Sequence, residues 1–388
     1  MPGARSGRKA RSSPQSRCAN ESASNIMKLA IIGCGRQGER HLAGLRESRY
    51  AAIPVVVADL HASRSRGLAA RFHTCDAATV DAALADRDVG AALICTPTMS
   101  HAALCARALQ AGKHVLCEKP LCDSLSQAAR LHALARQADR VLAVGYIYRH
   151  APRLAAARAA LVEDSFGSPA TPLGKVLTAW LRAGGRGDQS RWKHQRADGG
   201  GAVNEMLVHM IDLGIWIFGR CERVHVLAKK TLNPVRSIAG ETFSPDTEDF
   251  VIVKMACAGG LEYFIEADLA TPGFVQYLDV VGENGNLFTS ILPEFPSYLF
   301  LRTEKDGYPA GRSVLGEGPG NYYVPQIEAF LDATQGRPAP SLHRAEDSLE
   351  VMRLIDEVAC SGHPAPPRPR APRSATGLAL PGRRSWEG

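Results

Sequence analysis

The first 150 residues contain short apolar runs that alternate with stretches of helical periodicity. The apolar runs are Leu29–Gly33, Ile53–Ala58, Ala91–Cys95, His114–Glu118 and Val141–Val144. The helical patterns between them cover Gln37–Arg46, Ser63–Phe72, Ser100–Ala111 and Leu125–Ala138. Because short buried strands separated by helices form parallel sheets with both faces covered, this pattern predicts a doubly wound α/β domain. Ligands of such sheets bind at the carboxyl ends of the strands.

After about residue 150 the pattern changes to one long apolar helix, expected over Gly200–Phe218, followed by consecutive strands. The strand-like runs are Val224–Lys230, Asp249–Ala256, Leu261–Leu269, Phe274–Gly282 and Tyr298–Arg302. Turn signals such as Ala258-Gly259-Gly260 separate them, as in an antiparallel meander. We therefore expect a second domain of the α+β class with a mostly antiparallel sheet. Two closing helices, about Pro325–Thr334 and Arg344–Val358, are expected to pack on the core.

The 388 residues are 45% hydrophobic and 22% charged, which is enough for two packed domains. We place the first domain at 28–150 and the second at 151–360. The formal net charge of +7 is concentrated at the ends, because residues 1–27 and 362–388 each contain five basic residues and one acidic residue. The rest of the chain is close to neutral, so we expect no nucleic-acid partner. The ends, 1–27 and 361–388, are expected to be disordered.

The ten cysteines follow neither a Cys-x-x-Cys pattern nor a paired Cys/His spacing, so we expect no metal site and no disulfide. Several of them, including Cys34, Cys95, Cys105 and Cys117, lie within apolar runs and are expected to pack as small hydrophobic residues. Free thiols are typical of a reducing compartment, which favours the cytoplasm. No stretch approaches the roughly 18 apolar residues of a membrane span, and we expect no membrane partner.

Three glycines follow the first predicted strand in the run Gly33-Cys34-Gly35-Arg36-Gln37-Gly38, and Asp59 ends the second strand. The first glycine permits a tight turn, the second lets the backbone approach a pyrophosphate, and the third lets the helix pack closely on the strand. A carboxylate at Asp59 can accept the hydroxyls of an adenosine ribose and would repel a 2′-phosphate. The spacing predicts a dinucleotide-binding Rossmann domain that prefers NAD. Arg64 and Arg66 leave NADP open, and the alternative is that these residues only shape a turn.

Two further polar groups follow predicted strands, where the nicotinamide half of a dinucleotide would lie. The first contains Thr96, Pro97 and His101, and the second is Glu118-Lys119-Pro120. A lysine there can donate to a substrate hydroxyl and stabilise alkoxide character. The alternatives are a solvated surface lysine and, for His101, a packed or helix-capping histidine.

The apolar helix carries one polar stripe of Glu205, His209 and Asp212, if each residue advances by about 100°. A histidine has the pKa needed for general-base chemistry near neutral pH, and a flanking carboxylate could orient its ring. His209 is therefore a candidate base. The alternative is a core histidine that is hydrogen-bonded to Asp212.

In this order, the motifs resemble the Gfo/Idh/MocA family of oxidoreductases over about residues 28–360. Beyond the motifs already named, the resemblance rests on Gly145-Tyr146 with Arg149 and on Gly199-Gly200-Gly201 before the apolar helix. Trp192-Lys193 stands where Trp-Arg is common in the family, Glu205 replaces the usual aspartate, and Leu207 replaces a frequent glycine. The resemblance also implies a large open sheet in the second domain and a homodimer or homotetramer.

The resemblance implies a role for most of these residues. The implied catalytic residues are Lys119, Glu205 and His209. The implied cofactor-binding residues are Gly33, Gly35, Arg36, Gln37, Gly38, Asp59, Thr96, Pro97, His101, Glu118 and Lys119. The implied substrate-binding residues are Lys119, Tyr146, Arg149, Glu205 and His209.

The expected activity is that of an NAD(P)-dependent dehydrogenase, with NAD favoured and a small-molecule polyol or sugar as substrate. Hydride would pass between nicotinamide and a secondary alcohol of a sugar, cyclitol or nucleotide sugar. His209 would remove the hydroxyl proton, Lys119 would hold the same oxygen, and Glu205 would orient substrate or histidine. The alternatives are a catalytically silent NAD-binding regulator of the same fold and nucleic-acid binding by the basic ends.

Overall fold

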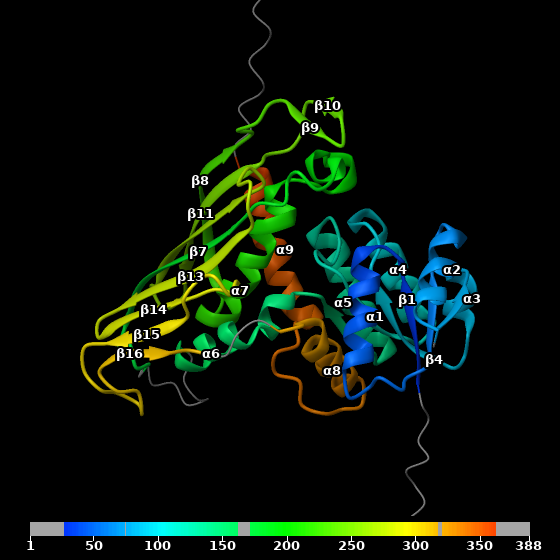
Figure 1. The fold of residues 1–388 in the computed structure, drawn as a ribbon, viewed down its shortest axis with the longest axis horizontal. Coiled ribbons are helices and arrows are strands. Elements are labelled where there is room, and N and C mark those ends of the chain that lie inside the picture. Colours follow the sequence, from blue (N-terminus) through cyan, green and yellow to red (C-terminus); the bar gives the residue numbers. More distant parts are fainter. Residues whose placement is uncertain (1–26, 74, 162–170, 317–319, 362–388) are drawn as a thin grey trace, which may run out of the picture.

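The computed structural model describes residues 27–73, 75–161, 171–316 and 320–361, which form two large sheets with helices packed against them (Figure 1). Residues 1–26 and 362–388, expected to be disordered, lie outside the described residues. The first sheet is built from the N-terminal part of the chain and the second from the part that follows it.

Six parallel strands form the first sheet, in the spatial order β3-β2-β1-β4-β5-β6. They are β1 (Lys28–Ile32), β2 (Val55–Ala58), β3 (Cys75–Ala78), β4 (Val89–Ile94), β5 (His114–Cys117) and β6 (Leu142–Val144). Residues such as Leu29, Ile31 and Leu93 are fully buried because helices cover both faces. The strand order runs outward from β1 and β4 in opposite directions, which confirms the doubly wound α/β prediction and places the ligand-binding point at the carboxyl ends of these two strands.

Helices on both faces complete this half of the molecule (Figure 1). They are α1 (Arg36–Glu47), α2 (Ala62–Arg71), α3 (Val80–Ala85), α4 (Thr98–Gln110) and α5 (Leu125–Ala138). The late helix α8 (Tyr323–Thr334) packs on α1, and its Ile327 and Phe330 share an apolar cluster with Leu29 and Leu42. The proposed second domain, 151–360, therefore contributes a helix to the core of the first sheet.

Eight strands form the second sheet, in the order β16-β15-β14-β13-β7-β12-β11-β8. They are β7 (Val176–Gly184), β8 (Cys221–Lys230), β11 (Phe250–Cys257), β12 (Glu262–Asp268), β13 (Val275–Gly282), β14 (Gly285–Thr289), β15 (Tyr298–Leu301) and β16 (Gly311–Val314). Strands β9 (Arg236–Ile238) and β10 (Glu241–Phe243) form a separate hairpin. The large, mostly antiparallel sheet confirms the α+β prediction.

The expectation of a simple meander is wrong at one place, because β7 lies between β12 and β13 and pairs in parallel with β12. Strand β7 is absent from the strands predicted from the sequence. Its outward residues include Thr178 and Arg182, which interrupt the apolar run that was used to find strands.

Helices α6 (Pro152–Leu161), α7 (Val208–Phe218) and α9 (Ala345–Cys360) pack between the second sheet and the rest of the molecule (Figure 1). Residues on this inner face, such as Val251, Val253 and Met255 of β11, are fully buried. The intervening residues of the strand point to the opposite face and remain partly accessible. The second sheet thus has one face covered by helices and one face without them among the described elements.

The predicted helix over Gly200–Phe218 begins with a π-helical turn, Val203–Leu207, and continues as α7. The N–H of Val208 bonds to the carbonyl of Val203, five residues earlier, so this turn is wider than an α-helical one. Three 3₁₀ turns also shape the region, at Ile147–His150, Arg191–His194 and Arg196–Asp198.

The expectation that no segment has the length and apolar character of a membrane span is also wrong. The helical stretch Arg196–Phe218 meets that criterion by length and composition. Inside the fold, 67% of its most apolar window is buried. Its apolar character is accounted for by packing within the molecule, against the second sheet and α9.

Two helical glycines provide a test of the packing between α7 and the second sheet. A Cβ atom at Gly214 would lie 2.4 Å from the hydroxyl oxygen of the buried Tyr263 on β12, whereas a Cβ at Gly67 on the exposed face of α2 would contact nothing within 4 Å. We expect Gly214→Ala to lower the free energy of unfolding by about 1–3 kcal/mol. Gly67→Ala should raise it by about 0.5–1 kcal/mol because alanine is the better helix former. Urea unfolding measures both, and equal changes in the two variants would contradict this packing.

Candidate active site

The glycine loop after β1 has the geometry of a dinucleotide cradle. Gly33 has φ of +100°, and a Cβ atom there would lie 2.6 Å from the carbonyl oxygen of Cys95. A Cβ at Gly38 would lie 2.0 Å from the carbonyl oxygen of Gly33, so helix α1 can begin only with glycine at this position. A Cβ at Gly35 would meet nothing within 4 Å, so this glycine faces open space at the helix N-terminus. The loop therefore fits a pyrophosphate.

The carboxylate of Asp59 is joined to this loop. One oxygen accepts the N–H of Cys34 at 2.8 Å, and the other accepts the N–H of His61 at 2.8 Å. Burial and the negative charge of Asp59 raise the pKa of the Cys34 thiol to about 12, so the thiol is neutral. Asp59 thus lies at the carboxyl end of β2, beside the cradle, where a ribose can be bound.

Two other residues of the loop are turned toward protein partners. The Arg36 guanidinium donates to Gln189 at 3.4 Å, on the loop after β7. The side-chain oxygen of Gln37 accepts from the hydroxyl of Tyr323 at 3.0 Å. The implied cofactor role of Gln37 is therefore not a side-chain contact, because its oxygen is engaged by α8.

Of the predicted site residues that follow β4 and β5, some make contacts within their own half of the molecule, and one points toward the other half. Thr96 and Pro97 lead into α4 beside Gly33. Both ring nitrogens of the buried His101 lie 2.8 Å from backbone carbonyls, those of Thr96 and Pro120. The ring of His101 thus joins the two strand ends, which agrees with the alternative of a packed histidine, and its implied cofactor contact stays a prediction.

The side chain of Glu118 is also held by a protein partner, and its implied cofactor contact stays a prediction. One oxygen lies 2.8 Å from His41 Nε2 on α1. Burial alone would raise the pKa of Glu118, but His41 and Lys119 outweigh it and lower that pKa below its usual range. Glu118 is therefore an ionised anchor that holds the end of β5 against α1.

Lys119 points the other way, toward the helix of the second half. Its Nζ lies 3.0 Å from Glu205 Oε1 and 3.4 Å from the Glu205 carbonyl oxygen in the π-helical turn. The second carboxylate oxygen of Glu205 lies 3.5 Å from Nζ of Lys193. One carboxylate thus holds two ammonium groups, and all three side chains are largely withdrawn from solvent.

His209 lies one turn beyond Glu205 and is partly exposed. Its ring packs between Tyr148, with centroids 4.8 Å apart, and Tyr146, with centroids 6.1 Å apart. Burial and the charge of Lys119 lower the pKa of His209 well below its ordinary value, so the imidazole is neutral at pH 7. Its Nδ1 is buried without a hydrogen-bond partner among the described residues. A neutral histidine beside a lysine ammonium can accept a proton from a bound hydroxyl.

The predicted polar stripe of Glu205, His209 and Asp212 is only partly correct. Asp212 binds Arg149 at 2.6 Å and the Nδ1 of His343 at 2.6 Å, and no hydrogen bond joins it to His209. Burial would raise the pKa of Asp212, but Arg149 and His343 outweigh it and keep that pKa below its usual range. Asp212 therefore does not orient His209 by a hydrogen bond, and the alternative of a core histidine satisfied by Asp212 is excluded as well.

Arg149 is likewise not free for a substrate, contrary to its implied role. Its guanidinium is buried, makes three contacts with Asp212, and donates to Asp347 at 3.0 Å. The ion pair joins the 3₁₀ turn after β6 to α7 and to the start of α9. Arg149 positions the helix that carries His209.

Three residues near His209 had no role assigned from the sequence: Arg186, Lys193 and Tyr148. Lys193 reaches Glu205 because its own carbonyl accepts the N–H of Gly201 at 2.8 Å, and a Cβ at Gly200 would lie 2.5 Å from that carbonyl. A run of glycines is a signal that permits such a close backbone approach. It did not indicate which segment would approach.

Two models of one protein family match most of the chain between residues 27 and 288. One, described as an oxidoreductase family with an NAD-binding Rossmann fold, covers residues 27–146, and the C-terminal domain model of the same family covers residues 155–288. The chain belongs to the GFO/IDH/MocA oxidoreductase family. Membership agrees with the cradle geometry, and it confirms NAD as the cofactor of the family fold.

Curated relatives of the GFO/IDH/MocA family share about a quarter of their residues with the chain. The chain is 25% identical to inositol 2-dehydrogenase of Rhizobium meliloti, covering 85% of this chain and 95% of the relative. It is 24% identical to levoglucosan dehydrogenase of Pseudarthrobacter phenanthrenivorans, covering 67% and 73%.

Solved structures of the family share the fold. GenD2 of gentamicin A biosynthesis, in complex with NAD, superposes with a TM-score of 0.68 at 25% identity and covers 85% of this chain and 92% of that one. Levoglucosan dehydrogenase with NADH and L-sorbose superposes with a TM-score of 0.73 at 21% identity, covering 86% and 95%.

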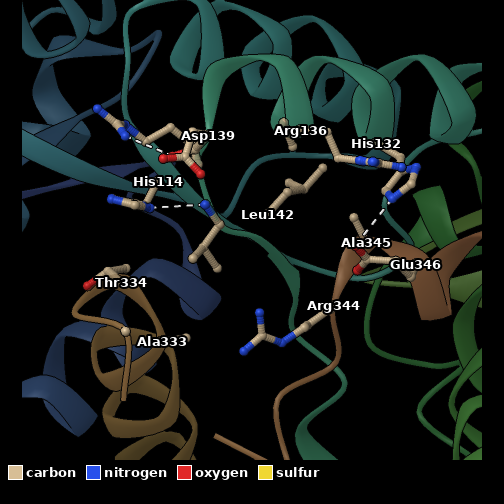
Figure 2. A pocket seen from close by; sticks show the side chains of 14 residues that line it. His114, His132, Arg136, Asp139, Leu142, Ala333, Thr334, Arg344, Ala345 and Glu346 are labelled. Atoms are coloured by element: carbon tan, nitrogen blue, oxygen red, sulfur yellow. Dashed lines mark hydrogen bonds and ion pairs between the residues drawn. The ribbon is translucent and has the colours of Figure 1, made fainter. Parts of the chain in front are cut away.

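A groove lies at the opposite edge of the first sheet, where β5 and β6 begin (Figure 2). This groove has a volume of about 590 Å³, and its lining includes His114, Arg136 and Arg344. No residue of the glycine loop and no side chain near His209 lines it. It is therefore separate from the candidate active site.

The buried histidines predict how stability depends on pH. Burial and the charge of Arg149 lower the pKa of His150 to about 3, whereas an unfolded histidine has a pKa of about 6.5. Between these values the unfolded chain binds a proton that the folded chain does not, so stability falls as pH falls. His150→Gln should make this loss shallower by about 1 kcal/mol for each pH unit, measured by urea unfolding at pH 7, 6 and 5. His73→Gln, at an exposed histidine, is the control, and an unchanged slope in His150→Gln would refute the burial argument.

Proposed function

We propose that the protein is an NAD-dependent dehydrogenase that oxidises a secondary alcohol of a sugar, cyclitol or nucleotide-linked sugar. The observation that carries this proposal is the position of the Lys119 ammonium, 3.0 Å from Glu205 and one helical turn before the neutral His209. The names of the related inositol and levoglucosan dehydrogenases support the substrate class.

Bound NAD supplies the acceptor for the hydride. Lys119 donates a hydrogen bond to the alcohol oxygen and stabilises the negative charge that develops there. His209 accepts the hydroxyl proton, because its depressed pKa keeps the ring neutral and ready as a base. Glu205 and Lys193 position the Lys119 ammonium rather than His209. Tyr146 packs edge-on against the imidazole and restricts its orientation.

For the cofactor, we propose that the backbone of Gly33, Gly35 and Gly38 receives the pyrophosphate and that Asp59 accepts the adenosine ribose hydroxyls. The fit is supported by the open space at Gly35 and by the tight approach of Gly38 to Gly33. Arg36, Thr96 and Pro97 border the same cradle.

We further propose a homodimer or homotetramer that forms through the uncovered face of the second sheet. Aromatic side chains are stacked along this face, including Trp180 on Phe264 at 5.0 Å and Tyr277 on Phe288 at 5.5 Å. Phe300 remains 41% exposed there. A cytoplasmic location is proposed because buried cysteines such as Cys105 and Cys117 are free thiols.

The proposed chemistry is tested by a screen of polyols, sugars and nucleotide sugars with NAD and NADP, following the absorbance of the reduced cofactor. Lys119→Met should reduce kcat/KM at least about 100-fold, because the donor to the alcohol oxygen is lost. NAD affinity, measured by fluorescence, should be retained. Lys175→Met, at an exposed lysine, is the control.

Unchanged turnover in Lys119→Met would refute the assignment of Lys119. If the wild-type protein binds NAD but oxidises no alcohol in the screen, the result favours the catalytically silent NAD-binding protein instead.

The cofactor preference is tested at Asp59. Asp59→Asn keeps an oxygen that can accept the N–H of Cys34 but removes the charge that repels a 2′-phosphate. We expect the ratio of kcat/KM for NAD to that for NADP to fall by at least about 10-fold. Asp306→Asn, on the exposed turn between β15 and β16, should leave the ratio unchanged. A ratio that does not move in Asp59→Asn would place the adenosine ribose elsewhere.

A further inference from the structure

The loop that follows β7 holds an arginine in an unusual setting. In the run Gly184-Gly185-Arg186-Gly187, Arg186 has φ of +64°, a left-handed conformation that favours glycine or asparagine. A Cβ at Gly185 would lie 2.3 Å from the carbonyl oxygen of Gly273, and a Cβ at Gly187 would lie 2.0 Å from that of Leu269. The loop is therefore packed tightly against the segment between β12 and β13, and the position of Arg186 is fixed by the fold.

The Arg186 guanidinium has no carboxylate partner among the described residues, although it is only partly exposed. Its carbon lies 3.9 Å from the ring centroid of Phe274, at the end of the same packed segment. An aromatic face holds a guanidinium flat while leaving its edge of N–H donors available. Arg186 thus has the geometry of an arginine prepared to bind an oxyanion in a bidentate manner.

The surroundings of Arg186 place it beside the reacting groups. Lys193 Nζ donates to the Arg186 carbonyl at 3.2 Å and lies 3.5 Å from Glu205, which binds Lys119. The positive charge of Arg186 also contributes to lowering the pKa of His209 and counteracts the rise in the pKa of Tyr148 that burial causes. The backbone of Arg186 therefore lies beside the lysine that binds Glu205, and its positive charge acts on the rings of both His209 and Tyr148.

The charges of this region do not balance. Lys119, Lys193 and Arg186 contribute three positive charges. Glu205, which binds both lysines, supplies one negative charge, and Glu118, which binds His41, supplies another. Asp212 is the nearest further carboxylate on this helix, but Arg149 and His343 already bind it. An excess of positive charge remains where the alcohol would bind.

We infer that the alcohol substrate carries an oxyanion, a carboxylate or a phosphate ester, and that Arg186 binds this group while Lys119 and His209 act on the hydroxyl. This inference rests on the proposed dehydrogenase function. Its substrate class is thus an acidic sugar or polyol derivative rather than a neutral one.

The pyrophosphate of the dinucleotide is the competing ligand for Arg186, because Gln189 of the same loop contacts Arg36 in the glycine loop. The stacking on Phe274 and the contact of the Arg186 carbonyl with Lys193, which binds Glu205, favour the substrate side. The two assignments differ in a measurable way. Loss of Arg186 should change the KM of the alcohol if it binds substrate, and the KM of NAD if it binds the cofactor.

The experiment compares neutral and anionic members of matched pairs as substrates with NAD. Glucose is compared with glucuronate and with glucose 6-phosphate, and N-acetylglucosamine is compared with UDP-N-acetylglucosamine. The uronate tests a carboxylate, and the other two test phosphate esters. For at least one pair, wild-type kcat/KM should be at least about 10-fold higher for the anionic member.

Three variants assign that preference to Arg186. Arg186→Asn removes the charge and suits the left-handed backbone, so the loop is expected to keep its shape. It should reduce the anionic preference by about 10- to 100-fold, with the KM for NAD unchanged. Arg186→Lys should keep part of the preference. Arg191→Gln, at an exposed arginine paired with Glu241, is the matched control and should keep all of it.

Equal or better use of the neutral members by the wild type would overturn the inference while leaving the dehydrogenase proposal intact. An equal loss for neutral and anionic members in Arg186→Asn, or a higher KM for NAD alone, would overturn it too. If no member of any pair is oxidised, the proposed function is not supported by these substrates, and binding decides the inference. Glucuronate or glucose 6-phosphate, added with NADH, should then raise the Tm of the wild type and not that of Arg186→Asn, and no rise in the wild type would overturn it.

Discussion

The candidate site depends on one carboxylate, Glu205, which lies between two ammonium groups. Lys119 comes from the end of β5 in the first sheet, whereas Glu205 and Lys193 belong to the second half of the chain. Removing charges from water is costly, and a buried pair is retained only where its geometry compensates that cost. The geometry here fixes the Lys119 ammonium between the two halves of the molecule, so the contact that joins them also positions the group proposed to hold the substrate oxygen.

A second buried network of hydrogen bonds and ion pairs holds α7 in place. Asp212 receives Arg149 and His343, and Ser348 donates to His343 from α9 if the imidazole donates its Nδ1 proton to Asp212. Asp212 belongs to α7, Arg149 to the turn after β6, His343 to the segment just before α9, and Ser348 to α9. His209 therefore lies on a helix whose other side is attached to the turn after β6 and to the C-terminal part of the chain. Its ring needs no hydrogen bond from Asp212 to be oriented, because Tyr146 and Tyr148 pack around it.

The sequence was informative where local rules determine the structure. A strand, three spaced glycines and a helix predict one loop geometry, and Gly33 and Gly38 adopt it. The position of Lys119 at a strand end was predicted from the same alternation of strands and helices. The sequence was less informative where long-range contacts decide. Arg149 was assigned to substrate by resemblance, but its partner Asp347 is almost 200 residues away, and no local pattern indicates that pairing.

The error on the polar stripe has a local cause. The 100° advance assumed a regular α-helix, whereas Val203–Leu207 forms a π-helical turn that rotates Glu205 relative to the residues after it. The wider turn directs Glu205 toward the two lysines, whereas Asp212 lies in the regular part of the helix and binds Arg149. The prediction of a regular helix therefore combined two separate features into one polar stripe. One is the ionic contact between the two halves of the molecule, and the other is the buried ion pair that anchors the helix.

The electrostatic arrangement of the site follows from the combination of these features. A histidine that must accept a proton is best kept neutral, and its burial beside Lys119 does so by lowering its pKa. The same ammonium that depresses the pKa of the imidazole favours the ionised form of an alcohol bound between them, because a positive charge stabilises an alkoxide as it disfavours an imidazolium. In the proposed reaction, Lys119 therefore keeps the histidine unprotonated before the transfer and stabilises the alkoxide as it forms, while it also makes the imidazole a weaker base. Glu205 and Lys193 fix where that charge is placed.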